Sequence, residues 1–155
     1  MDEAQREAGY VRIVVPLDRD PGDDGPDDEW VWAEPLGAGR YRIESTPFFA
    51  YGLSHGDVVC ASDTTDLPRM SDVERKGGHR TLRVAVDPQW TIEHPDIREL
   101  LAGFADAGCS WESMPPQIIA LDIPPDLDVE RVVEVLQGPF DEGILIWEWA
   151  DPRPC

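Results

Sequence analysis

The sequence predicts an α+β protein with a small β-rich lobe, a barrel or a sharply curled sheet, followed by a ferredoxin-like β-α-β-β-α-β lobe. Short β-branched runs separated by glycine turns fill residues 10–79, a pattern typical of small barrels. Residues 80–150 instead place two segments with helical apolar spacing among strand-like runs. We therefore expect lobes over residues 10–79 and 80–150, a disordered N-terminus at 1–9 and a tail at 151–155.

Five strands are expected in the first lobe, at residues 10–17, 30–36, 40–44, 58–60 and 70–76. Pro16 places the first strand at an edge or an end of its sheet, because proline cannot donate to a ladder. The glycines of residues 37–39 predict a hairpin between the second and third strands. The Gly56-Asp57 pair is a turn signal immediately before the fourth strand.

The second lobe is expected to contain strands at 80–86, 109–114, 118–123 and 144–149 and helices at 95–107 and 128–137. Pro95 fits the first turn of the first helix, and Gly108 fits its end. Asp126 or Asp128 would cap the second helix, and Gly138 would follow its last turn. Both helices have one apolar face, so we expect them to cover one side of an antiparallel sheet. The expected core residues include Leu101, Phe104, Val133 and Leu136.

The charge of the chain is strongly negative. It has 32 acidic and 13 basic residues, for a formal net charge of −19. Such a surface repels nucleic acids and anionic membranes and attracts basic proteins, although acidity can also serve solubility alone. Residues 18–29 hold the densest acidic run and predict a mobile loop. The run lacks the ligand spacing of a calcium-binding loop.

Three cysteines, Cys60, Cys109 and Cys155, provide neither a disulfide framework nor a pair of C-x-x-C motifs for zinc. We expect Cys60 and Cys109 to be small core residues and Cys155 to be exposed. The sequence shows no signal-peptide pattern and no apolar run long enough to cross a membrane. The prediction is a soluble cytoplasmic protein without a metal or a cofactor.

Three segments carry a resemblance to a known family: W-A-E-P-L at 32–36, P-F-F-A-Y-G-L-S-H-G-D-V-V at 47–59 and G-H-R-T-L-R-V at 78–84. Together they resemble a bacterial family of acidic, two-lobed proteins catalogued only as a domain of unknown function. The resemblance extends from the first strand to the last. It implies no activity, cofactor or catalytic residue.

Two histidines beside glycines are the candidates for catalysis. His55 precedes the Gly56-Asp57 turn and His79 follows Gly77-Gly78, so both could converge, with Asp57 or Glu74 orienting an imidazole as a general base. The alternative is that both lie on separate exposed loops. His94, just before Pro95, fits a position that caps or flanks a helix. Neither a hydrolase elbow nor a phosphate-binding loop is present.

Aromatic and basic residues are the candidates for binding. Alternation places Trp30 and Trp32 on one face of a strand, and likewise Trp147 and Trp149. Each pair is either core material or an exposed patch for a partner. The arginines that would contact a ligand between the lobes are Arg40, Arg42 and Arg80.

Three classes of function fit these observations. The first is a non-enzymatic acidic binding module that neutralises or regulates a basic protein partner, as an immunity-type protein does. The second is a sensor or carrier that holds a small molecule between the lobes. The third is an enzyme that uses His55, Asp57 and His79. The binding module is favoured because no complete catalytic constellation can be assembled from the sequence.

Overall fold

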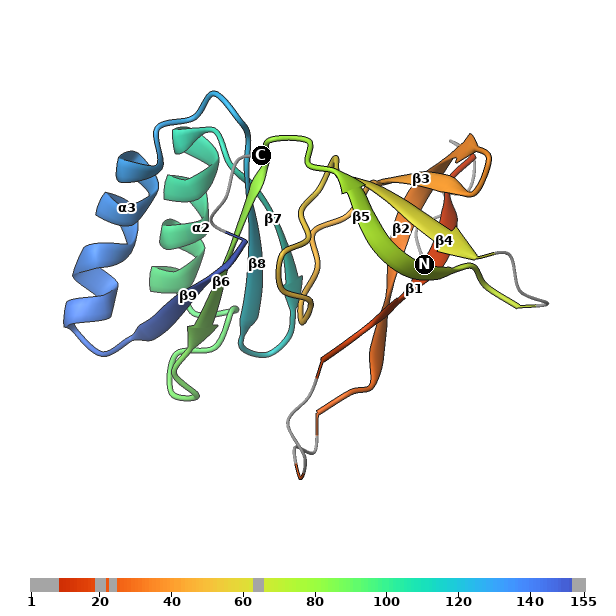
Figure 1. Ribbon diagram of the computed structural model, residues 1–155. Coiled ribbons are helices and arrows are strands. Elements are labelled where there is room, and N and C mark those ends of the chain that lie inside the picture. Colours follow the sequence, from red (N-terminus) through yellow and green to blue (C-terminus); the bar gives the residue numbers. More distant parts are fainter. Residues whose placement is uncertain (1–8, 19–21, 23–24, 63–65, 152–155) are drawn as a thin grey trace.

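The computed structural model describes residues 9–18, 22, 25–62 and 66–151, which form a mixed α+β structure with two lobes (Figure 1). The first lobe is a closed β-barrel, and the second is a four-stranded sheet covered on one face by two helices. The predictions for residues 1–8, for most of the tail with Cys155, and for residues 19–21 and 23–24 of the acidic run lie outside the described residues.

The barrel contains the five predicted strands: β1 (Val11–Pro16), β2 (Asp28–Gly37), β3 (Arg40–Ile43), β4 (Val58–Ser62) and β5 (Arg69–Arg75). Successive strands pair antiparallel, and the parallel contact of Val14 with Arg69 closes β1 onto β5. Gly37 and Gly39 both adopt a positive φ in the turn between β2 and β3, as the hairpin signal predicts.

Alternate barrel residues point inward and form the core of this lobe. The strand residues in this core are Ile13, Val15, Val31, Ala33, Tyr41, Ile43, Val59 and Ala61. Because neighbouring side chains of a strand point to opposite faces, Trp30, Trp32 and Cys60 lie on the outer face.

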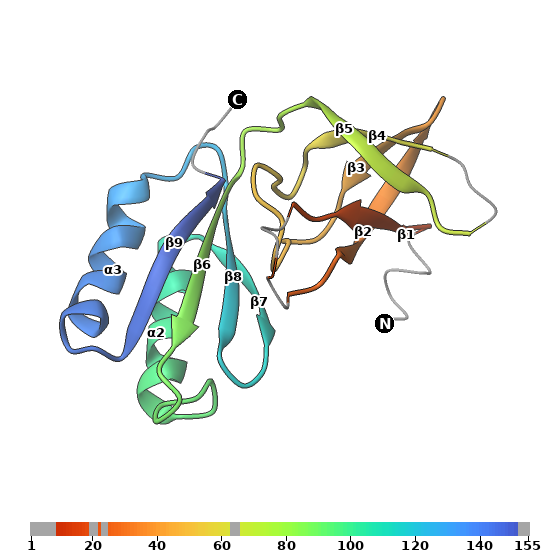
Figure 2. The same cartoon turned by 60° about the horizontal axis from the view of Figure 1, so that its bottom comes forward.

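The second lobe contains β6 (Arg80–Val86), α2 (Pro95–Ala107), β7 (Ser110–Met114), β8 (Ile118–Ile123), α3 (Val129–Asp141) and β9 (Leu145–Asp151). Its sheet has the order β7-β8-β6-β9, and the strand pairs are antiparallel. Both helices cover the same face, while the other face is turned toward the barrel (Figures 1 and 2).

Helix α2 has the predicted ends. The ring of His94 accepts a hydrogen bond from the backbone N–H of Asp96, so His94 caps the helix, and Gly108 ends it at φ +103°. The predicted end of α3 is wrong, because the helix continues through Gly138 and Pro139 to Asp141. Gly143, at φ +76°, supplies the left-handed residue instead.

The helical faces agree with the sequence except at one position. Leu101, Phe104 and Leu136 are buried in the core under the helices, as predicted. Val133 is only half-buried, and Val132 is fully buried in its place. Val132 and Leu136 are four residues apart and therefore share the helical face that contacts the sheet. Within the described part of the chain, no helix is long and apolar enough to cross a membrane.

One loop of the barrel packs against the second lobe. Residues 44–57, here called the interlobe loop, leave the barrel after β3 and lie between it and the uncovered face of the second sheet (Figures 1 and 2). Along this loop, the Thr46 N–H donates to Glu112 Oε2 of β7 at 2.6 Å. The Gly52 N–H donates to the carbonyl of Ala150 in β9 at 2.9 Å. The loop therefore lies across the second sheet, although in sequence it connects two barrel strands, β3 and β4.

Candidate functional site

The barrel holds the interlobe loop through one carboxylate. Glu29, at the start of β2, accepts backbone N–H bonds from Phe48, Phe49 and Ala50 at 3.0, 3.1 and 2.7 Å. The sequence predicts that Glu29 belongs to the mobile acidic loop. That prediction is wrong for Glu29, because β2 already begins at Asp28. Three donors on one carboxylate fix the local course of the loop.

The second sheet holds the same loop through Arg83 of β6, which is 6% exposed. Its Nη1 donates to the carbonyl of Ala50 at 2.9 Å, and its Nε donates to Glu148 Oε1 at 3.4 Å. The guanidinium carbon lies 4.6 Å from the centroid of the Tyr51 ring, and the Tyr51 hydroxyl donates to Glu148 at 2.9 Å. The guanidinium of Arg83 thus makes a hydrogen bond and a cation–π contact with the interlobe loop.

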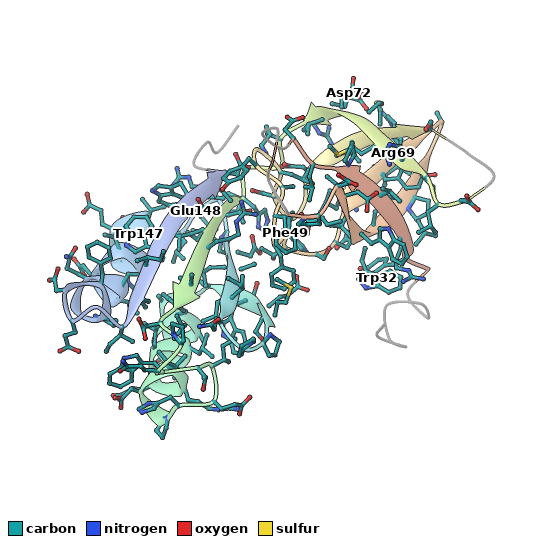
Figure 3. All side chains as sticks on the ribbon, turned by 90° about the horizontal axis from the view of Figure 1, so that it is seen from below. Trp32, Phe49, Arg69, Asp72, Trp147 and Glu148 are labelled. Carbon is teal, nitrogen blue, oxygen red and sulfur yellow. The ribbon has the colours of Figure 1, made fainter. Side chains whose placement is uncertain are left out.

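Beside Arg83 lies a pocket of about 500 Å³, here called the interlobe pocket. It opens between the β1–β2 hairpin, the interlobe loop and the uncovered face of the second sheet. Its apolar lining includes Leu17, Pro26, Phe48, Phe49, Tyr51 and Ile146. Figure 3 shows Phe49 at the junction of the lobes, with Glu148 on β9 on the other side of the junction.

Exposed apolar side chains are concentrated around the pocket. Phe49, Tyr51 and Ile146 are 38, 66 and 67% exposed, and they are three of the five large exposed hydrophobic residues in the described part of the chain. The other two are Trp30 and Phe140. Exposed apolar side chains that gather around a concavity are a common property of binding sites.

The arginines predicted to contact a ligand do not line this pocket. Arg40 pairs with Glu74 at 3.3 Å and Arg42 pairs with Glu34 at 2.7 Å, in both cases on the barrel. The Nε of Arg80 is buried without a hydrogen-bond partner. Arg83 was not predicted as a site residue from the sequence. The available signal was its position in β6, where Leu82 and Val84 face the helices and Arg83 must face the barrel.

The two tryptophan pairs differ in environment. Trp30 is 56% exposed on the outer face of the barrel, with the Arg12 guanidinium 4.7 Å from its ring centroid. Trp32 shares that face, is half-buried, and is on the barrel in Figure 3. Trp147 and Trp149 instead pack against the core under the helices, with their ring centroids 6.1 Å apart. Trp147 is also among the residues that line the interlobe pocket.

The structure brings His55 and His79 together, with ring centroids 5.3 Å apart. His55 lies on the interlobe loop, and His79 lies immediately before β6. His79 Nδ1 is 2.8 Å from Oδ1 of Asp122, a buried residue of β8. Asp122 was not among the predicted site residues, although a lone acid in the apolar run Ile118–Ile123 was a visible signal.

Asp57 does not orient these imidazoles. It is fully buried, and its carboxylate accepts bonds from the backbone N–H groups of Ser54 and Gly77 and from the Lys76 ammonium group. Glu74 is engaged by Arg40 on the barrel surface. The predicted His55/Asp57/His79 grouping is therefore replaced by His55, His79 and Asp122.

The two described cysteines are free, and they differ in burial. Cys109 belongs to the core under the helices, and burial, with a further effect from Asp122, raises its pKa from 9.0 to about 11. Cys60 is only half-buried on the barrel's outer face, so its prediction as a core residue is wrong. Desolvation, followed by the nearby Asp72 carboxylate, raises the pKa of its thiol.

These features define a two-lobed α+β protein whose candidate binding site lies where the lobes meet. Residues 29–147 match the family described as Domain of unknown function (DUF4265), and the chain belongs to this family. It is also similar to a solved structure, a hypothetical protein from Neisseria gonorrhoeae, with a TM-score of 0.75 and 16% identity. That match covers 93% of this chain and 96% of the other, and it concerns the fold alone. A search of curated proteins found no match.

Proposed function

We propose that this protein is a non-enzymatic binding module that holds a basic protein partner at the interlobe pocket, and so neutralises or regulates that partner. The observation that carries the proposal is the gathering of Phe49, Tyr51 and Ile146 around a single concavity. Protein interfaces commonly depend on a few apolar or aromatic side chains seated in such pockets. The partner would place one apolar side chain into the interlobe pocket.

The charge of the surroundings supports a basic partner. The whole chain has a net charge of −19. Two acidic residues, Asp18 and Glu148, and one basic residue, Arg83, line the pocket. The guanidinium of Arg83 is already bound to the interlobe loop and to Glu148. The long-range field would speed the approach of a cationic protein and slow that of an anionic one. Basic residues around the inserted side chain would then face Asp18 and Glu148.

The test compares proteins retained from a native lysate by immobilised wild-type chain and by two variants. Ile146→Ser removes an apolar side chain from the pocket, while Phe140→Ser removes another large exposed hydrophobic side chain, from α3 and away from the pocket. We expect a basic protein to be retained by the wild type and by Phe140→Ser, and lost from Ile146→Ser. Retention should also weaken as salt increases, since ions screen the attraction.

Two results would overturn this proposal. One is the retention of the same proteins, in the same amounts, by Ile146→Ser as by the wild type. The other is the absence of any protein whose retention depends on both the pocket and the salt concentration. Thermal unfolding of each variant serves as a control, because an exposed substitution should change stability by no more than about 0.5 kcal/mol.

A small-molecule ligand is the second candidate, favoured by the size of the pocket. About 500 Å³ lies within the range of roughly 300–1,000 Å³ typical of small-molecule sites. The surrounding carboxylates favour a neutral or cationic amphipathic compound. Ligand-observed NMR with cationic, neutral and anionic fragments would test this, since binding should favour the first two classes and should be lost in Ile146→Ser. An equal response from all classes would count against a pocket ligand.

The second lobe is, we infer, a ferredoxin-like sandwich. The strand order β7-β8-β6-β9, with both helices on one face, supports this finer assignment. We further infer that the protein acts in the cytoplasm. The free thiols of Cys60 and Cys109 fit a reducing compartment.

A further inference from the structure

Three residues from three separate elements meet at the lobe junction, outside the interlobe pocket. His55 comes from the interlobe loop, His79 from the segment before β6, and Asp122 from β8. One ligand atom from each lies within 4.8 Å of the other two. None of the three residues lines the interlobe pocket, whereas Ile118, at the other end of β8 from Asp122, does.

Two glycines permit this approach. A Cβ on Gly77 would lie 2.5 Å from the Gly56 carbonyl oxygen, a contact that real structures do not tolerate. A Cβ on Gly56 would lie 3.3 Å from the His79 ring, and Gly56 has φ +87°. The two backbone segments therefore touch only because both positions are glycine, and their contact brings the imidazoles side by side.

Neighbouring groups orient the three side chains. His79 Nδ1 lies 2.8 Å from Asp122 Oδ1, while the Ser110 hydroxyl donates to Asp122 Oδ2 at 3.4 Å. His55 Nε2 lies 3.6 Å from a Glu44 carboxylate oxygen. Ser110 and Glu44 lie outside the cluster, and hydroxyls and carboxylates in such positions commonly orient metal-binding side chains.

One polar atom in the cluster is unsatisfied. His55 Nδ1 is buried and has no hydrogen-bond partner. Leaving a buried polar atom without a partner is costly, so such an atom often marks a missing ion or ligand. The side chains of His55 and His79 are nevertheless 33 and 23% exposed, which leaves a route for an ion from solvent.

We propose that His55, His79 and Asp122 bind one divalent first-row transition-metal ion. Two imidazoles and one carboxylate suit zinc, iron, cobalt or nickel, whereas calcium and magnesium prefer all-oxygen sites. Three protein ligands leave at least one position of the ion open to water or to another ligand. The ion would join the interlobe loop to the second sheet. The sequence predicts no metal site because these ligands are 24 and 43 residues apart and share no motif.

Calorimetric titration with Zn²⁺, in an excess of Mg²⁺ to occupy weak acidic sites, tests the proposal. We expect one Zn²⁺ per wild-type chain, with affinity at least about tenfold lower in His55→Gln, His79→Gln and Asp122→Asn. The matched control is His94→Asn, which replaces the histidine outside the cluster with a residue that can also cap a helix. This variant should bind Zn²⁺ as the wild type does. Equal binding by wild type and His55→Gln, or loss of binding in His94→Asn, would overturn the proposal.

A second measurement needs no variant. Co²⁺ bound to two imidazoles and a carboxylate at a low-coordinate site should produce visible absorption bands stronger than those of aqueous Co²⁺, and Zn²⁺ should displace it. An unchanged aqueous spectrum in the folded wild-type protein would reject the site even if a cluster variant failed to fold.

Discussion

Lys76 and Asp151, 75 residues apart in the chain, form an ion pair at 2.5 Å across the lobe junction. Lys76 is the only lysine in the sequence, and it follows directly after β5. Its ammonium group also contacts Asp57 and donates to the carbonyl of Gly52 at 3.0 Å. Asp57 and Asp151 are 0 and 2% exposed, so one cation compensates two buried carboxylates.

Replacing Lys76 with Met should therefore destabilise the protein strongly. The substitution leaves two buried carboxylates without a counter-charge, and removing one partner of a buried ion pair costs about 3–5 kcal/mol. Urea unfolding at neutral pH measures the loss. The control is Arg40→Met, which breaks an exposed pair with Glu74 and should cost about 0–1 kcal/mol. Equal losses in both variants would mean that the buried network contributes no special stability.

Replacing Glu29 with Ala should loosen the interlobe loop without disrupting the barrel. The change removes the acceptor of three backbone N–H groups, at a cost of roughly 1.5–3 kcal/mol. Hydrogen exchange should accelerate at Phe48, Phe49 and Ala50 before it does in β4. The comparison is Asp28→Ala, which removes only a 3.8 Å pair with Arg69. Unchanged protection at residues 48–50 would contradict this role for Glu29.

Ionisation of Cys109 should weaken the fold at alkaline pH. Its pKa is raised from 9.0 to about 11, so the folded state favours the neutral thiol. That stability is fully present below pH 9 and is lost as the pH rises toward 11. At 1.36 kcal/mol per pKa unit, the loss is about 2–3 kcal/mol. Urea unfolding at pH 8, 10 and 11 should show a steeper decline for the wild type than for Cys109→Ala. Parallel declines would mean that the thiol is not responsible.

The tryptophans of the two lobes should differ in their contribution to stability. Trp149→Ala removes a ring packed against the core under the helices and should cost about 2–4 kcal/mol. Trp30→Ala removes a side chain that is 56% exposed and contacts Arg12, and should cost less than about 1 kcal/mol. Thermal and urea unfolding of both variants provide the comparison. A larger cost at Trp30 would contradict the outward orientation of that ring.

Much of the fold could be predicted from residue periodicity. Strands β6 and β8 and helix α2 have the predicted bounds, because alternation, Pro95 and Gly108 agree locally. The end of α3 was missed because Gly138 is a strong local signal that the helix nevertheless passes. Alternation also placed Trp30 and Trp32 on one face. Alternation does not say whether this face points into or out of the barrel. The closed arrangement of the five strands places it outside.

The candidate site was harder to predict, because its parts are distant in sequence. His55 and His79 could be selected from their glycine neighbours, but their carboxylate partner, Asp122, comes from the second sheet. Which arginine of β6 lines the pocket depends on the face of the strand from which its side chain projects. Arg80 and Arg83 are an odd number of positions apart, so they lie on opposite faces, and only Arg83 reaches the pocket.

Gly77 and Gly78 lie in the segment that connects the two lobes in sequence. Every barrel strand ends by Arg75 and every strand of the second sheet begins at or after Arg80, so a cut between these glycines interrupts no hydrogen-bonded ladder. The two fragments would retain complementary surfaces, with the interlobe loop on one and its contacts from Arg83 and Asp151 on the other. The protein is thus suited to a split-reporter design, in which reassembly of the halves signals that the lobe junction has formed.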